Sequence, residues 1–270
     1  MQTSKIKKPT LAIIIPAYNE ERYIRRSLDS IAQQTVQPNE VIVIDNNSTD
    51  NTRAVAASYN FVRVVSETRQ GCIFAVFKGF EVANSDILAR IDSDNMLSKN
   101  WVEDIIDNYQ QRHFDACSGS CSFYDFPYHK FAEWLHTFVY HGIQKMIAGT
   151  EVLWGTNMAI SKSAWRRIRN ECKKLPGADE DICMSLLLKQ HNLTVKRFNN
   201  MQLATSLRQQ HHTYFSIIRY LSTWPRDYFL CKRYWAGAQI TVLTFILMLI
   251  AWVPGVARFF YLHKPKLAKE

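Results

Sequence analysis

The stretch Leu11-Ala12-Ile13-Ile14-Ile15-Pro16-Ala17-Tyr18-Asn19-Glu20 joins an apolar run to a turn and to the start of an amphipathic segment. Similar β-branched runs occur at 40–45, 62–66 and 87–92, and longer segments with apolar residues at helical spacing lie between and after them. This alternation is typical of βαβ units, in which helices join parallel strands and cover the sheet. We therefore predict an α/β fold with a mostly parallel central sheet flanked by helices.

The predicted helices lie at 20–34, after 48–50, at 71–82 and at 98–111. We expect Asn19 and Ser98 to cap the first and the last of them, because Asn and Ser side chains accept hydrogen bonds from the N–H groups of a first helical turn. Beyond Asp115 the alternation weakens, and an aromatic-rich segment leads to Trp154. We expect this segment to belong to the same domain.

The chain of 270 residues is long enough for one large α/β core, and it carries a formal net charge of +9. Such a charge suits a nucleotide, an anionic membrane surface or a nucleic acid. Basic residues crowd the last quarter of the chain beside its most apolar stretch, which favours a membrane surface over nucleic acid. We expect a basic tail at 1–8, one main domain at 9–215, and an amphipathic and apolar membrane-associating region at 216–270.

The apolar run at 237–253 reaches only the lower limit of the roughly 17 to 25 residues that span a bilayer. A single span, a shallow interfacial helix, a helix that binds a partner protein and a C-terminal helix packed on the domain all remain open. Nearby aromatic residues such as Trp224 and Trp235 favour the membrane. No N-terminal signal peptide is visible, so we expect the protein at the cytoplasmic face of the membrane, anchored by 237–253.

Polar residues follow three of the predicted strands, at the edge where open parallel sheets bind ligands. In Pro16-Ala17-Tyr18-Asn19-Glu20, backbone N–H groups and the Tyr18 ring can face a base or a phosphate, although the segment also fits a strand stop and a helix cap. Asp45 can accept a hydrogen bond from a base N–H, or it can fold an Asx turn. Asp92-Ser93-Asp94 places two carboxylates where they can bind Mg²⁺ or Mn²⁺ together with phosphate oxygens, and a surface turn is the alternative.

A fourth acidic group, Asp179-Glu180-Asp181, begins a predicted helix with apolar residues at Ile182 and Leu186. Acidic residues in a first turn stabilise a helix through its dipole, so a capping role is one interpretation. The other is a general base that deprotonates an acceptor hydroxyl. A single base of this kind suits an inverting transfer with in-line attack.

Six segments together resemble the family 2 glycosyltransferases and their nucleotide-binding GT-A fold, over roughly residues 9 to 200. They are 13–20, 41–50, Arg69-Gln70-Gly71 with Lys78-Gly79, Asp92-Ser93-Asp94, Gly155-Thr156-Asn157-Met158-Ala159-Ile160, and Glu180-Asp181. The order and spacing of the six are highly specific, whereas no single segment is decisive.

The resemblance implies a role for each matching residue. Pro16, Ala17, Tyr18 and Glu20 would line the nucleoside pocket, Asp45 would meet the base, and Arg69 or Gly71 would lie near the ribose and phosphates. Asp94 would bind the metal ion, and Asp92 would lie near the ribose or the metal. Asp181 would be the catalytic base and Glu180 would position the acceptor. The Gly155-Thr156-Asn157 turn would lie under the donor sugar or the acceptor.

The sequence thus predicts a metal-dependent, inverting hexosyltransferase that moves a sugar from a UDP- or GDP-sugar to an acceptor hydroxyl, in cell-envelope or lipid-linked glycan synthesis. Processive synthases of the family often carry Gln-x-x-Arg-Trp after the base, and Arg208-Gln209-Gln210-His211-His212 matches it only loosely. His211 or His212 is either a further metal ligand or a surface residue. A nucleotidyltransferase that makes activated sugars would need a Gly-rich phosphate loop, which 16–20 lacks, and a non-catalytic membrane-associated scaffold would leave the strand-end acids without a purpose.

Overall fold

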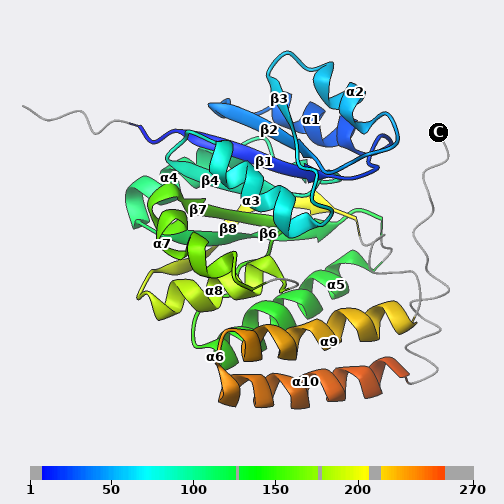
Figure 1. Ribbon diagram of the computed structural model, residues 1–270, viewed down its shortest axis with the longest axis vertical. Coiled ribbons are helices and arrows are strands. Elements are labelled where there is room, and N and C mark those ends of the chain that lie inside the picture. The colour runs from blue at the N-terminus through cyan, green and yellow to red at the C-terminus, as the bar shows by residue number, and fades with distance from the viewer. Residues whose placement is uncertain (1–7, 126–127, 176–177, 207–213, 253–270) are drawn as a thin grey trace, which may run out of the picture. The chain divides into compact units, whose positions relative to one another are not determined.

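The computed structural model describes residues 8–125, 128–175, 178–206 and 214–252 (Figure 1). The chain divides into two compact units. Unit 1 comprises the residues up to 120 together with 155–167 and 196–203, and unit 2 comprises 121–154, 168–195 and the chain from 204 onward. The regions predicted at 1–8, 9–215 and 216–270 stay predictions.

An eight-stranded sheet has the spatial order β3-β2-β1-β4-β7-β6-β8-β5. Its strands are β1 (Leu11–Ala17), β2 (Glu40–Asp45), β3 (Val62–Ser66), β4 (Ile87–Ile91), β5 (Met96–Leu97), β6 (Ala116–Phe123), β7 (Asn157–Ser161) and β8 (Val195–Thr205). The neighbours β3, β2, β1 and β4 are parallel, whereas β7 is antiparallel to β4 and to β6. The predicted strands at 40–45 and 62–66 are confirmed to the residue, 11–15 extends to Ala17, and 87–92 ends at Ile91.

The register of the parallel strands brings their carboxyl ends to one edge of the sheet. Ala17 pairs with Asp45, and Asp45 pairs with Ser66. β2 and β4 are buried along almost their whole length, because a parallel sheet is covered by helices on both faces. The turns that follow β1, β2 and β4 therefore begin at neighbouring places on the same edge.

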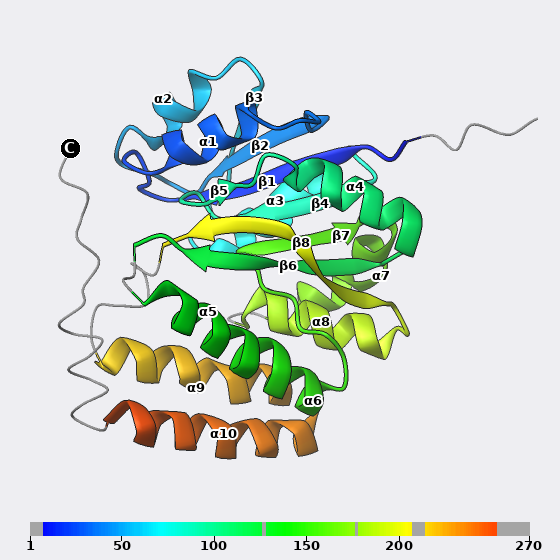
Figure 2. The same ribbon diagram turned by 180° about the vertical axis from the view of Figure 1, so that it is seen from behind.

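Helices of unit 1 cover the two faces of this sheet. They are α1 (Ile24–Ala32), α2 (Thr52–Ala57), α3 (Cys72–Val82), α4 (Trp101–Arg112) and the first part of α7 (Lys162–Cys172). Figures 1 and 2 show α3 and α7 on one face and α1 and α4 on the other. Trp165 of α7 contacts Phe77 and Phe80 of α3, with ring centroids 5.1 Å apart in each pair. Gly79 lets α3 approach β1, because a Cβ there would lie 2.3 Å from Ile14 Cγ2.

Two predicted helix caps are wrong. α1 begins at Ile24 with Tyr23 as its N-cap, and α4 begins at Trp101 with Asn100 as its N-cap. Asn19 instead adopts a left-handed conformation, with φ of 55°, and its side chain bonds to the loop after β2. A long-range hydrogen bond thus replaces the local cap that the sequence pattern suggested.

Unit 2 is helical. It contains α5 (His129–His136), a π-helix η1 (Thr137–Ile143), α6 (Gln144–Ala148), α8 (Glu180–Gln190), α9 (Tyr214–Leu230) and α10 (Tyr234–Trp252). Its core joins Tyr140 of η1, Ile182 of α8, Trp224 and Tyr228 of α9, and Ile240 of α10. α9 and α10 run antiparallel and side by side in both views (Figures 1 and 2).

The predicted apolar run at 237–253 lies in α10, apart from residue 253, which is outside the described residues. In the part of the chain that the structure describes, no helix combines the length and the apolar character needed to cross a membrane. α10 packs on the rest of unit 2 through Ala236 and Ile240, and it exposes large apolar side chains elsewhere along its length.

Candidate functional site

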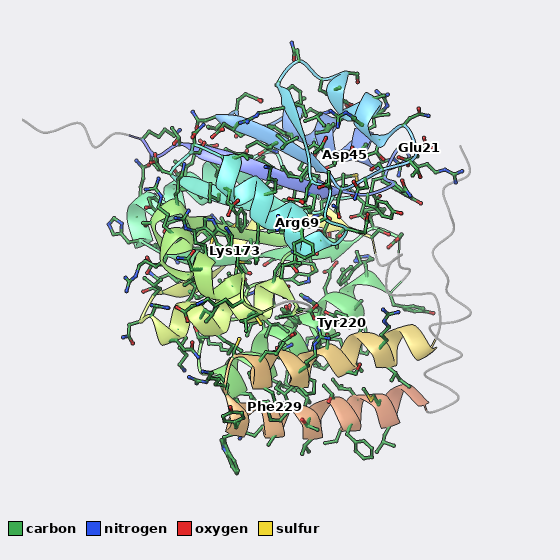
Figure 3. The ribbon with its side chains drawn as sticks, in the orientation of Figure 1. Glu21, Asp45, Arg69, Lys173, Tyr220 and Phe229 are labelled. Atoms are coloured by element: carbon green, nitrogen blue, oxygen red, sulfur yellow. The ribbon has the colours of Figure 1, made fainter. Side chains whose placement is uncertain are left out.

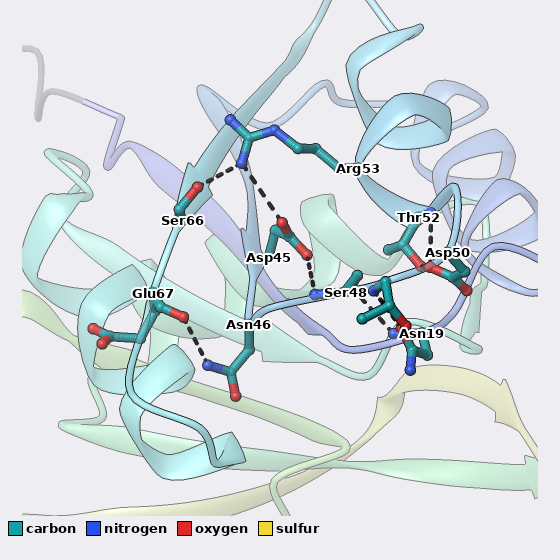
Figure 4. A network of polar contacts seen from close by, with 10 residues as sticks. Asn19, Asp45, Asn46, Ser48, Asp50, Thr52, Arg53, Ser66 and Glu67 are labelled. Carbon is teal, nitrogen blue, oxygen red and sulfur yellow. Dashed lines mark hydrogen bonds and ion pairs between the residues drawn. The ribbon is translucent and has the colours of Figure 1, made fainter.

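The turn after β1 is bonded to the loop after β2 (Figure 4). Asn19 Oδ1 accepts a hydrogen bond from Thr49 N–H at 2.8 Å, and Asn19 N–H donates to Ser48 Oγ at 3.1 Å. Glu20, which is buried, donates its N–H to Thr52 Oγ1 at 2.6 Å. Tyr18 in the same turn is 49% exposed. The predicted nucleoside-binding segment at 16–20 is therefore held in place while its aromatic ring faces outward.

Asp45 ends β2 and is buried. Its Oδ1 accepts the Ser48 N–H at 3.1 Å, which is the Asx turn that the sequence left as an alternative. Its Oδ2 lies 3.5 Å from Arg53 Nη1, and that guanidinium also donates to Ser66 Oγ (Figure 4). The carboxylate thus organises the turn, and its predicted contact with a nucleotide base stays a prediction.

Asn46 is a site residue that the sequence reasoning missed. Its Nδ2 donates to the carbonyls of Glu67 at 2.9 Å and Arg69 at 2.7 Å, and its Oδ1 accepts the Gly71 N–H at 2.7 Å. The side chain is almost fully buried. Gly71 has a φ of 137°, which L side chains rarely adopt. Asn46 therefore fixes the loop between β3 and α3, and this loop carries two of the predicted ligand-binding residues.

Arg69 in this loop is held by the buried Glu67. The guanidinium donates from Nε to Glu67 Oε1 and from Nη2 to Oε2, both at 2.9 Å. These bonds hold the pKa of Glu67 down, to about 2. Arg69 also stacks over the Phe74 ring at 4.9 Å, yet its side chain is 64% exposed (Figure 3). A permanent, oriented cation is thus presented at this edge of unit 1, where it can meet a phosphate.

Asp92 directly follows β4, and both of its oxygens have a partner. Arg90 Nη2 donates to Oδ1 at 2.8 Å, and Thr156 Oγ1 donates to Oδ2 at 2.7 Å. Gly155 makes room for the arginine, because a Cβ there would lie 1.5 Å from Arg90 Nη1. The predicted turn at 155–157 therefore orients Asp92 through Thr156, which lies 64 residues later in the chain. Neither Arg90 nor this contact was predicted from the sequence.

Asp94 and Asn95 lie two and three residues beyond Asp92, and both are buried. Asn95 Nδ2 donates to the Thr156 carbonyl at 2.8 Å, while its Oδ1 has no partner among the described residues. Carboxylate and amide oxygens suit a hard divalent cation. In the part of the chain that the structure describes, no three His, Cys, Asp or Glu side chains group closely enough to hold a metal ion. A metal ion at Asp94 would thus need further oxygen ligands, which fits a site completed by phosphates.

Asn157 ends the predicted turn at 155–157, and its side chain is bonded within unit 1. Its Oδ1 accepts the Trp101 Nε1–H at 3.0 Å, and its Nδ2 donates to the carbonyls of Ser120 and Met201. It is fully buried, and these bonds join α4 to the sheet. The predicted place of the turn under the donor sugar or the acceptor stays a prediction. His211 and His212 lie outside the described residues.

The acidic pair Glu180–Asp181 lies in unit 2, at the first turn of α8. Asp181 Oδ1 accepts the Ile182 N–H at 2.7 Å. The Tyr140 hydroxyl lies 3.1 Å from Asp181 Oδ2 and 3.0 Å from the Leu153 carbonyl, so its one proton is shared. Burial and the charge of Asp181 raise the pKa of Tyr140 well above its usual value, which keeps the hydroxyl a donor. Asp179 precedes the pair as the N-cap residue, without a side-chain capping bond.

Comparison with known proteins places these residues in a family. A model described as glycosyl transferase family 2 matches residues 12–169, more than half of the chain. The chain belongs to this family. The match begins in β1 and contains Asp45, Arg69, Asp92 and Asp94.

Curated relatives match a shorter part. The chain is 29% identical over 120 residues to glycosyltransferase GlyG of Streptococcus pneumoniae, covering 43% of this chain and 40% of that protein. It is 41% identical over 115 residues to 4,4'-diaponeurosporenoate glycosyltransferase of Staphylococcus aureus, covering 40% of this chain and 30% of that protein. The chain therefore spans less than half the length of these relatives.

A solved structure extends the likeness in fold. Mannosyltransferase PcManGT from Pyrobaculum calidifontis, in complex with GDP-Man and Mn²⁺, superposes with a TM-score of 0.62. The superposition covers 96% of this chain and 86% of that chain at 15% identity. The predicted GT-A fold is thereby confirmed.

Proposed function

We propose that this protein transfers a sugar from a UDP- or GDP-sugar to an acceptor hydroxyl. The observation that carries the proposal is the pair of strand-end carboxylates, Asp92 and Asp94, with Asp92 held by Arg90 and Thr156. Family membership and the nucleotide-sugar ligand of the mannosyltransferase support this chemistry. They favour transfer over a nucleotidyltransferase or a non-catalytic scaffold.

The donor would be bound by the loops at the carboxyl edge of the parallel strands. Pro16, Ala17, Tyr18 and Glu20 would line the nucleoside pocket, with Asp45 at the base and Arg69 and Gly71 at the ribose and phosphates. Two observations support these roles, namely the exposed ring of Tyr18 and the oriented guanidinium of Arg69. Arg69 would meet the diphosphate as a charged donor, because its bonds to Glu67 fix its direction.

Asp94, with Asp92, would hold Mg²⁺ or Mn²⁺. The buried oxygens of Asp94 and Asn95 are hard donors that fit such an ion, and the mannosyltransferase complex contains Mn²⁺. When bound, the ion supplies positive charge against the diphosphate that leaves. Arg90 and Thr156 would keep Asp92 oriented toward the ribose or the ion throughout.

Asp181 would act as the general base toward the acceptor hydroxyl, with Glu180 positioning that acceptor. The hydrogen bond from Tyr140 and the bond from the Ile182 N–H support this role, because they fix the direction of the carboxylate without requiring it to be protonated. A single carboxylate base fits direct in-line attack and therefore inversion at the sugar carbon.

The acceptor would be lipid-linked or part of the cell envelope, and α10 would bring the protein to the cytoplasmic face of the membrane. Val242, Phe245, Ile246 and Leu249 of α10 are each about half exposed or more, and Trp235 at its start is 79% exposed. Lys232 precedes the helix and is exposed. Exposed apolar side chains beside cationic ones suit an anionic lipid surface.

Two assays test this function. Thermal unfolding with Mn²⁺ and a panel of UDP- and GDP-sugars should show stabilisation by one donor, about 2.7 kcal/mol at 100 times its dissociation constant. Asp94→Asn should abolish the Mn²⁺-dependent part of this stabilisation. Asp107→Asn, at an exposed position of α4, should preserve it. Asp181→Asn should keep the donor-induced stabilisation and lose transfer. Stabilisation of Asp94→Asn equal to that of the original chain would refute the metal assignment.

Membrane association is tested separately. Phe245→Ser combined with Leu249→Ser changes only exposed positions, so the fold should be retained. The variant should sediment less with vesicles that contain anionic lipid than the original chain does. Equal sedimentation of the two proteins would exclude α10 as the anchor.

A further inference from the structure

Asp227, in the last turn of α9, is a fully buried carboxyl group that none of the roles above uses. Its Oδ1 accepts the backbone N–H of Asp179 at 3.1 Å. Its Oδ2 has no hydrogen-bond partner among the described residues. Buried carboxyl groups without ionic partners are costly and uncommon, so this one calls for a physical account.

α9 holds Asp179 at a second point. Thr223 lies one turn before Asp227, and its Oγ1 is 2.7 Å from Asp179 Oδ2 and 2.8 Å from the Tyr220 carbonyl. The N-cap residue of α8 is therefore bound through both its backbone N–H and its carboxylate. Because Glu180 and Asp181 are the next two residues, these contacts fix the first turn of α8.

α9 also contacts Tyr140, whose hydroxyl bonds to Asp181. The rings of Trp224 and Tyr140 pack edge to face with centroids 5.9 Å apart, and the Tyr140 hydroxyl bonds to Asp181 Oδ2. One face of α9 thus contacts both Asp179, which directly precedes the acidic pair, and Tyr140, which bonds to the Asp181 carboxylate.

The electrostatic setting explains how a third acid is tolerated here. Burial, and next the charge of Asp179, raise the pKa of Asp227 to about 8, so the group is mostly protonated at pH 7. The charged and titratable groups that act on it or surround it are the N-cap residue Asp179, Asp181 and Cys183 of α8, Tyr220, Arg226 and Tyr228 of α9, and Cys231. A neutral acid accepts the Asp179 N–H without adding a third negative charge beside two carboxylates.

We propose that Asp227 is a positioning residue, which holds the first turn of α8 through Asp179 so that Asp181 stays oriented as the base. This inference rests on the proposed function, since it assigns the purpose of the contact to the Asp181 carboxylate. It follows that asparagine at position 227, the amide isostere of the neutral acid, should hold the first turn of α8 as well as Asp227 does. An apolar side chain of similar size should not.

The kinetic test compares Asp227→Asn, Asp227→Leu and the exposed control Ser222→Ala. Activity is hydrolysis of UDP-glucose or GDP-mannose by the full chain with Mn²⁺, in which water takes the sugar and the released UDP or GDP is measured. We expect Asp227→Leu to lower kcat about 10²-fold, the loss that a displacement of about 1 Å causes, with the donor KM unchanged. Asp227→Asn and Ser222→Ala should each keep the kcat of the original chain. Full kcat in Asp227→Leu, or an equal loss in Asp227→Asn, overturns the proposal.

Hydrogen exchange of the peptide 178–186 gives a readout without turnover. Asp227→Leu should speed exchange in the first turn of α8, and Asp227→Asn should not. If Asp227→Leu does not fold, Thr223→Val should show the same acceleration to a smaller degree. Equal exchange in all variants overturns the proposal even where no activity is found. If exchange is faster in Asp227→Leu but the original chain releases no nucleotide, the proposed function fails. The role of Asp227 in orienting Asp181 as a base then fails with it.

Protonation of Asp227 is tested by the pH dependence of unfolding. The folded state keeps a proton that the unfolded chain, with its lower pKa, releases, so this group costs stability as the pH rises from about 4 to 8. Asp227→Asn removes that cost. Its Tm should therefore exceed that of the original chain at pH 8, and the difference should shrink toward pH 4. A Tm below that of the original chain at pH 8 would contradict a neutral Asp227.

Discussion

The close approach of Arg90 to Gly155 makes Gly155→Ala a sharp test of how Asp92 is held. The new Cβ would lie 1.5 Å from Arg90 Nη1 and 2.7 Å from Cζ. Nonbonded heavy atoms rest at about 3.5 Å, so the guanidinium has to move by about 2 Å. Arg90 is only 6% exposed, so packed neighbours rather than solvent must give way. The 2.8 Å bond from Arg90 Nη2 to Asp92 Oδ1 cannot survive such a shift.

The expected cost combines two effects. Forcing an extra methyl group into a packed site costs about 1–3 kcal/mol, and a lost hydrogen bond to a charged group costs about 1.5–3 kcal/mol. Because the neighbours relax in part, we expect about 3 kcal/mol in total, which lowers Tm by about 6–12 °C in a chain of this size. Affinity for UDP or GDP with Mn²⁺ should fall as well, since Asp92 loses its orientation.

Differential scanning calorimetry and titration calorimetry measure the two effects. Gly142→Ala in η1 is the matched control, because a Cβ there meets only the Thr137 carbonyl at 3.6 Å, an ordinary contact. Its Tm should stay within about 2 °C of the original value, less than the shift that 1 kcal/mol would cause. An unchanged Tm together with unchanged nucleotide affinity in Gly155→Ala would refute the steric reasoning.

Other predictions follow from the same edge of unit 1. Asn46→Ala leaves the Gly71 N–H and two carbonyls without their partner, so the free energy of unfolding should fall by about 1–3 kcal/mol or more, measured by urea titration. Asn46→Asp should recover little of this free energy, because a carboxylate can accept the Gly71 N–H but cannot donate to the carbonyls of Glu67 and Arg69. The low pKa of Glu67 stabilises the fold above about pH 4.5, and this contribution is lost as the pH falls toward 2. Arg69→Gln should therefore lower Tm at pH 7 more than at pH 2.5, and an equal loss at both would contradict the ion pair.

The sequence predicted the strands well, since their signal is local. β2 and β3 consist largely of β-branched residues. β2 is buried along almost its whole length, and a strand buried on both faces has to be apolar at nearly every position. Helix starts were predicted less well. Asn19 looks like a cap in the sequence, but its side chain is bonded to Thr49, 30 residues away. A local pattern cannot show which of two possible partners a short polar side chain chooses.

The same distinction separates the candidate site residues that the sequence indicates from those that it does not. The sequence indicates Asp45 and Asp92 because they end apolar runs, and the edge of a parallel sheet is where such residues can meet ligands. Asn46, Glu67 and Arg90 were missed because their roles depend on loops brought together by the fold. Asn46 acts on a loop 21 to 25 residues away, and no feature of its immediate neighbours indicates this. Asp227, 48 residues from Asp179, had no local signal at all.

The bond between Thr156 and Asp92 also bears on the order in which the protein acquires binding competence. β1 to β4 can pair from the first 91 residues, since all their contacts lie within them. Asp92, however, is oriented only after β7 has paired antiparallel with β4 and brought Thr156 and Gly155 to the end of that strand. Closing this 64-residue loop is slower than forming local structure. A chain released during synthesis before residue 155 would thus contain the parallel strands without an oriented Asp92, and the proposed binding of a nucleotide would depend on the pairing of β7 with β4.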